Sequence, residues 1–202
     1  KARSRQRTYF NNPVDPRICV IESISFTHDE LKTLLTEAGE AEDELAFWSD
    51  FGRADALGSL VRVDSSLIQR MERHLANTDF GENLFGSELR ARAERLLVQT
   101  RYLSPRYSVV VANPPYMGSR NMEAWLAEHA RRSYPISKAD LFSMFIERCL
   151  SLATCGGYVG MITMQGWMFL PSFAGLRRAV VQEHRLLSMA HLGTRAFDSI
   201  GG

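Results

Sequence analysis

The sequence predicts an α/β protein in which a mostly helical segment precedes an open, doubly wound sheet of parallel strands. From Arg106 onward, apolar strands alternate with amphipathic helices, a pattern that favours a parallel sheet. The strands at 107–112 and 158–163 are almost continuously apolar, which is typical of strands covered on both faces. We therefore expect two parts, a mostly helical segment with a short N-terminal strand at 1–103 and the sheet-bearing part at 104–202.

The first part carries one predicted strand and several predicted helices. The run RICVIE at 17–22 has the composition of a short strand. Thr27 and Glu30 have the spacing of a capping box, so a helix should begin there, and Gly39 should end it. Apolar residues at helical spacing predict three more helices. They lie near 45–51, 65–75 and 87–99.

The second part carries three predicted strands with helices between them. Strands are expected at 107–112, 158–163 and 187–192, and helices near 122–131, 139–153 and 172–184. Gly156 and Gly157 are expected to form the turn from the second of these helices into its strand.

The composition limits the classes of function that this chain can have. The chain has 202 residues, of which 45% are hydrophobic and 23% charged, as in ordinary globular domains. The net charge is only +1, so any attraction to nucleic acid must come from a local patch. Three cysteines without metal-ligand spacing indicate reduced thiols and no metal site. No apolar run approaches the ~20 residues of a membrane span, so we expect a cytoplasmic protein without a membrane partner.

The residues that carry chemistry are Asn113, Pro114, Pro115 and Tyr116, directly after the strand at 107–112. Ligands of open α/β sheets bind at the carboxyl ends of strands. An amino group conjugated to an aromatic ring needs acceptors for its two N–H groups before its nitrogen can attack. The Asn113 side chain and the Pro114 carbonyl can supply them on a rigid corner, and Tyr116 can stack on the ring. The competing interpretation is a plain turn closing the strand.

Longer runs of the sequence resemble a known family. VVVANPPYMG resembles motif IV of the amino methyltransferases, in its adenine-N6 form. KADLFSMFIERCLSLATCGGYVGMITMQGWMFL and HLGTRAFDSIGG resemble the motifs that follow it. Over residues 106–202 the chain most resembles the adenine-specific DNA methyltransferases of bacterial phage-exclusion (BREX) systems, the PglX type. The resemblance implies a Rossmann-like class I methyltransferase sheet, of which 104–202 would be the C-terminal, target-base half.

The same resemblance implies an activity and roles for single residues. The activity is methyl transfer from S-adenosylmethionine to N6 of adenine in double-stranded DNA, in phage defence or restriction-modification, with other defence proteins as further partners. Asn113 and Pro114 would accept the hydrogen bonds of the target amine. Tyr116 would stack on an adenine flipped out of the duplex, and Phe197 would close the other face of that base.

The resemblance is less complete on the cofactor side. Pro115 would lie near the cofactor's adenosine. Asp140 could contribute to the cofactor site or could simply form a capping box with Ser137, and the sequence leaves both open. No run of the form Asp-Pro-x-x-Gly-x-Gly is present. Since Lys1 is not a methionine, we expect a segment of a longer protein. Because the Gly-rich run is missing, we expect this segment by itself to bind the cofactor weakly or not at all and to be inactive.

Two other functions remain open. Enzymes that methylate RNA adenines or protein glutamines carry the same Asn-Pro-Pro-Tyr element. The chain could instead be a non-catalytic interaction module, with its helical part as the docking surface.

Overall fold

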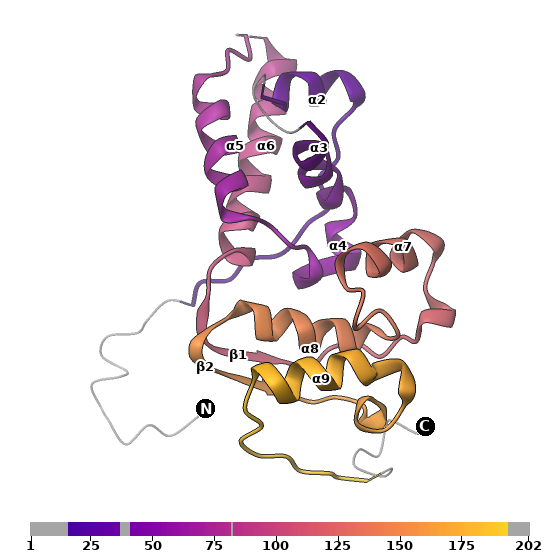
Figure 1. Cartoon of the computed structure of the whole chain (residues 1–202). Helices are drawn as coiled ribbons and strands as arrows, with labels where there is room; N and C mark the ends of the chain where they lie inside the picture. Colours follow the sequence, from indigo (N-terminus) through magenta and orange to yellow (C-terminus); the bar gives the residue numbers. More distant parts are fainter. Residues whose placement is uncertain (1–15, 37–40, 82, 194–202) are drawn as a thin grey trace, which may run out of the picture. The chain divides into compact units, whose positions relative to one another are not determined.

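The computed structural model describes residues 16–36, 41–81 and 83–193, which form two compact units (Figure 1). The first contains the described residues up to Gly58 together with Ile68–Tyr102. The second contains Ser59–Leu67 and the described residues from Leu103 onward. The division of the sequence into domains at 1–103 and 104–202 stays a prediction. None of the described helices is long and apolar enough to cross a membrane.

The first unit is helical, as the apolar spacing predicts. Its elements are α2 (His28–Leu34), α3 (Ala41–Asp50), η1 (Phe51–Arg53), α4 (Ala54–Leu57), most of α5 (Ser65–Asn77) and most of α6 (Leu84–Leu103). The capping box of α2 is confirmed: Thr27 Oγ1 accepts from Glu30 N, and the Glu30 carboxylate accepts from Thr27 N at 2.7 Å. The helix ends at Leu34, and Gly39, its predicted end, lies outside the described residues.

Aromatic side chains fill the core of the first unit. Trp48 is 1% exposed, and the Phe26 and Phe47 rings meet it edge-on at 5.3 and 5.0 Å. Glu44 is also fully buried, and its carboxylate accepts hydrogen bonds from Thr36 N at 2.7 Å and Thr36 Oγ1 at 2.6 Å. Nε of Arg70 lies 3.1 Å from the same carboxylate, and together these groups compensate a charge that would be costly to bury alone.

The strand predicted at 17–22 is not formed. Ile18 and Val20 are 77% and 70% exposed, and the Glu22 N–H donates to Gln99 Oε1 at 2.9 Å. No strand of the described residues pairs with this segment. A strand exists only where a neighbour completes its backbone hydrogen bonds, and local composition does not supply that neighbour.

The second unit is built on a β-α-β arrangement. Its elements are β1 (Tyr107–Ala112), η3 (Ser119–Asn121), α7 (Ala124–Ser133), α8 (Leu141–Leu152), β2 (Ala153–Met161), η4 (Gln165–Met168), η5 (Pro171–Phe173) and α9 (Ala174–Glu183). Among the described residues the sheet has two strands, β1 and β2, which pair in parallel. The predicted α/β class with a parallel sheet is therefore confirmed.

Helices cover one face of this sheet. Phe142 and Ile146 of α8 pack with Leu176 and Val180 of α9, and Met161 of β2 packs against the same cluster. Figure 1 shows the ribbons of these two helices beside β1 and β2. The other face is exposed: the side chains of Val109, Val111 and Tyr158 are 59%, 78% and 60% accessible. α8 and α9 belong to one cluster with β2, so both helices cover the same face of the sheet. Within the described residues, the prediction that helices cover both faces therefore does not hold.

The glycine pair 156–157 forms a turn inside β2. Tyr107 pairs with Ala153, but Val109 pairs with Tyr158, so β2 loops outward between these pairs. Gly156 adopts a φ of 75°, and a Cβ on Gly157 would lie 3.0 Å from the Ser108 carbonyl oxygen. The pair therefore makes a turn as predicted, although the strand begins before it.

The strand predicted at 187–192 is also wrong. The structure assigns no helix or strand there, and Leu187, Met189 and Leu192 are 63%, 57% and 64% exposed. β1 and β2 pair only with each other among the described residues, so this apolar run has no strand to join.

A buried arginine fixes Ser59–Leu67 in the second unit. Arg148 of α8 is 6% exposed, and its Nε donates to the Ser59 carbonyl at 2.7 Å. Its Nη2 donates to the carbonyls of Val61 and Leu103 at 2.9 and 2.7 Å. One side chain thus donates to three carbonyls on two segments far apart in the chain, which is more than the two N–H donors of an amide side chain could satisfy.

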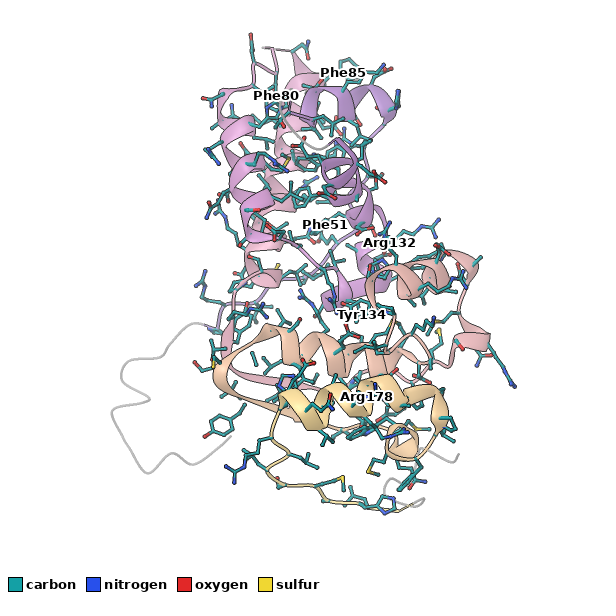
Figure 2. All side chains as sticks on the ribbon, in the orientation of Figure 1. Phe51, Phe80, Phe85, Arg132, Tyr134 and Arg178 are labelled. Atoms are coloured by element: carbon teal, nitrogen blue, oxygen red, sulfur yellow. The ribbon has the colours of Figure 1, made fainter. Side chains whose placement is uncertain are left out.

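Polar side chains beside Arg148 continue this attachment. The hydroxyl of Tyr134, labelled in Figure 2, donates to the Leu60 carbonyl at 2.6 Å. The Arg62 guanidinium lies 4.2 Å from the centroid of the Tyr134 ring and binds the Glu147 carboxylate at 2.6 Å. Ser137 donates to the other Glu147 oxygen at 2.6 Å.

Candidate active site at the carboxyl end of the first strand

The Asn-Pro-Pro-Tyr corner follows β1 directly. Ile162 N donates to the Ala112 carbonyl at 3.3 Å, so the corner begins where β1 and β2 stop pairing. Asn113 is exposed, Pro114 is buried and Pro115 is exposed. The corner is therefore anchored by one proline, while the neighbouring amide stays accessible.

The aromatic ring of the corner rests on the core. Tyr116 meets Phe142 of α8 with ring centroids 6.1 Å apart and planes 72° apart. Phe142 is 2% exposed and in turn contacts the ring of Phe173 at 5.6 Å. Tyr116 itself is 36% exposed. The core thus supports this ring on one side and leaves part of it open to a ligand.

The residues after Tyr116 are hydrogen-bonded to the start of α8. Leu141 N donates to the Met117 carbonyl at 3.1 Å, and Ser119 N donates to the Ala139 carbonyl at 2.9 Å. Gly118 and Asp140 form an antiparallel bridge between these two bonds. These hydrogen bonds therefore attach the loop that follows the corner to the start of α8.

Asp140 is the residue that joins the corner to α8. It is the N-cap of the helix, and its Oδ1 accepts hydrogen bonds from Phe142 N at 3.2 Å and Met117 N at 3.1 Å. The predicted capping box with Ser137 is wrong, because the helix begins at Leu141 and Ser137 donates to Glu147 instead. Burial raises the pKa of Asp140, while the backbone donors oppose that rise.

We expect Asp140→Ala to lower the free energy of unfolding by about 1–2 kcal/mol, because both backbone donors lose their acceptor. Asp140→Asn keeps an acceptor oxygen and serves as the matched control. Because the folded-state pKa of Asp140 is raised, the wild type loses stability as pH rises from the ordinary value of 3.8 through the folded value. Asp140→Asn should therefore become more stable relative to wild type across that window. Urea titrations at pH 3.5 and pH 7 measure both effects; equal midpoints for wild type and Asp140→Ala would contradict the capping role.

Residues 162–164 follow β2, which ends at Met161, as the corner follows β1, and Met164 is 48% exposed. The next residue, Gln165, hydrogen-bonds through Oε1 to Nε2 of His191. The strand predicted at 158–163 extends two residues beyond the observed end of β2, and its carboxyl end lies at the same edge of the sheet as the corner.

Phe197, the predicted second wall of a base pocket, lies outside the described residues. Arg177 Nη1 donates to the carbonyls of Trp167 and Leu170 at 2.8 and 2.6 Å and so holds the turn at η4. Among the described residues, no three His, Cys, Asp or Glu side chains gather as metal ligands.

Comparison with known proteins places the chain in a family. The family model for the Eco57I restriction-modification methylase matches residues 34–197, which include the corner and all of α8. The chain is 37% identical over 155 residues to the adenine-specific methyltransferase BrxX of Escherichia coli, which covers 75% of the chain and 13% of that protein. It is 34% identical over 215 residues to the adenine-specific methyltransferase PglX of Lacticaseibacillus casei, covering 100% of the chain and 17% of that protein.

A more distant relative is the type II methyltransferase M.XhoI of Xanthomonas vasicola, 27% identical over 209 residues, which covers 89% of the chain and 38% of that protein. The chain thus spans less than a fifth of the length of BrxX or PglX. Because the family match extends over most of the sequence, the chain belongs to the Eco57I restriction-modification methylase family.

Proposed function

We propose that this chain is part of an S-adenosylmethionine-dependent DNA methyltransferase and holds the amino group of the target adenine. One observation carries the proposal: an exposed asparagine and a partly exposed tyrosine ring stand on a corner fixed to β1 and α8. Membership of a restriction-modification methylase family, with two relatives named adenine-specific, supports it.

The chemistry begins with the amino group. Its lone pair is delocalised into the purine ring, and it becomes nucleophilic when acceptors draw on both N–H groups. We assign these acceptors to Asn113 Oδ1 and the Pro114 carbonyl. Pro115 restricts ψ of Pro114, and the ring of Pro114 is buried, so that carbonyl keeps its direction and the acceptors need little reorganisation during the reaction.

The base must leave the duplex to reach this corner. Tyr116 would receive one face of the extruded adenine, since its ring is supported by Phe142 and still 36% exposed. Stacking on such a ring contributes about 1–3 kcal/mol. Phe197 remains our proposed ring for the opposite face.

We assign no complete cofactor site to the described residues. Pro115 is exposed and could line such a site, and Oδ1 of Asp140 accepts two backbone N–H groups. S-adenosylmethionine supplies an activated methyl group when bound, and we assign its binding to another part of the full protein. We therefore expect calorimetry to detect no micromolar binding of S-adenosylmethionine to this chain. A micromolar dissociation constant would contradict this assignment.

The substrate is tested with the full-length gene product and labelled S-adenosylmethionine. We expect methyl incorporation at N6 of adenine in duplex DNA. Transfer only to RNA or to glutamine of a release factor would support the competing enzyme functions, and no transfer would support an interaction module.

The family's restriction-modification name supports a role in marking cytoplasmic host DNA for phage defence. Methylome sequencing with and without the gene tests that role.

A further inference from the structure

We propose that Arg120 and Lys138 form a phosphate-binding pair that holds the target DNA strand beside the extruded adenine. This inference rests on the proposed function and adds a binding site to it. It concerns two cations that the acceptor chemistry of the corner does not use.

Backbone hydrogen bonding brings the chain neighbours of the two residues together. Gly118 bridges Asp140 in antiparallel fashion, and Ser119 N donates to the Ala139 carbonyl at 2.9 Å. Arg120, in η3, directly follows Ser119, and Lys138 directly precedes Ala139. Each cation therefore lies one residue away from the same hydrogen bond.

Both cations are exposed, and neither takes part in an ion pair within the part of the chain that the structure describes. The neighbouring acidic groups are already engaged. Asp140 accepts from two backbone N–H groups, and Glu123 accepts from Trp125 Nε1 at 2.6 Å. The positive charge at this end of the loop is therefore available to an anion.

The pair lies a short stretch of chain from the ring that would receive the base. Arg120 follows Tyr116 by four residues, which span at most about 14 Å when extended. The bonds to Met117 and Ser119 hold the intervening loop on α8. A phosphate bound here would keep the target strand in register with the corner while its base rotates out. Phosphate contacts of this kind position DNA without reading its sequence.

This local site also agrees with the charge of the chain. A net charge of +1 gives no general attraction to DNA, so contacts must come from cations gathered at one place. Each phosphate neutralised by such a contact releases counterions. The slope of the logarithm of the binding constant against the logarithm of the salt concentration becomes steeper by about 0.9 per phosphate.

The experiment compares wild type with Arg120→Ala, Lys138→Ala and the double variant of the full-length gene product. Arg131→Ala is the matched control, since Arg131 is exposed and pairs with Glu128 at 2.8 Å. Duplex DNA binding is measured at several salt concentrations, and methylation is measured over a range of DNA concentrations up to saturation. We expect the slope to fall by about 0.9 for each single variant and about 1.8 for the double variant. KM for DNA should rise, kcat should stay within about twofold, and Arg131→Ala should match wild type.

The outcomes separate this inference from the proposed function. If wild type does not methylate duplex DNA, the proposed function fails. If wild type methylates DNA and the double variant keeps the wild-type slope, only the phosphate pair is overturned. A loss of affinity confined to cognate DNA would also overturn it, because removal of a phosphate contact weakens binding to all sequences alike. Arg120→Gln with Lys138→Gln, checked by thermal unfolding, guards against a folding defect in the alanine variants.

Discussion

Asn113→Ala will lower kcat for adenine methylation by at least about 100-fold and change the free energy of unfolding by less than about 0.5 kcal/mol. The activity falls because one of two fixed acceptors for the target amine is removed. Stability is preserved because Asn113 is exposed at the end of β1, so no buried group loses a partner. Single-turnover methylation of duplex DNA by the full-length gene product measures the first effect, and urea unfolding measures the second.

Two further variants make this result specific. Asn121→Ala removes an exposed asparagine from the loop that follows the corner, and it should leave kcat unchanged. Asn113→Asp keeps an acceptor oxygen at the same position and should retain more activity than Asn113→Ala. Full modification by Asn113→Ala would remove this residue from the proposed mechanism, whatever the controls show.

Arg148→Ala should produce the largest loss of stability, about 3–5 kcal/mol in the free energy of unfolding. The substitution leaves the carbonyls of Ser59, Val61 and Leu103 without their buried donor. Each buried polar group left unpaired costs about 1–3 kcal/mol, reduced where water can enter. Guanidinium unfolding of this chain is the measurement.

Its controls separate the hydrogen bonds from the charge. Arg148→Lys keeps a positive charge but cannot present the planar fork, so it should recover only part of the loss. Arg90→Ala removes a half-exposed arginine in a surface pair with Glu94 and should cost less than about 1 kcal/mol. Limited proteolysis should cut Ser59–Leu67 faster in Arg148→Ala. An unchanged midpoint with an unchanged cleavage rate would show that Arg148 does not hold this segment.

Several features of the fold follow from short stretches of sequence. The capping box at Thr27 sets the start of α2, and β1 spans the predicted residues. These features depend on groups within a few residues of each other. The corner after β1 was predictable for the same reason, because proline restricts its own backbone and the strand is read from its local pattern.

Features that depend on distant partners were not predictable. The sequence left two roles open for Asp140. Only the folded chain brings Met117 N within hydrogen-bonding distance of the Asp140 carboxylate, which joins the loop to α8. The two failed strands, at 17–22 and 187–192, have suitable compositions but no described strand pairs with them.

The sequence by itself determined the helices, the two paired strands and the placement of an acceptor-bearing corner after the first strand. Only the tertiary structure decided which segments meet. Arg148 reaches a carbonyl 89 residues away, and no local pattern encodes that contact. The physical reason is that capping, periodicity and backbone restriction act over one or two turns. By contrast, strand pairing and the satisfaction of buried charge require groups that the folded chain brings together.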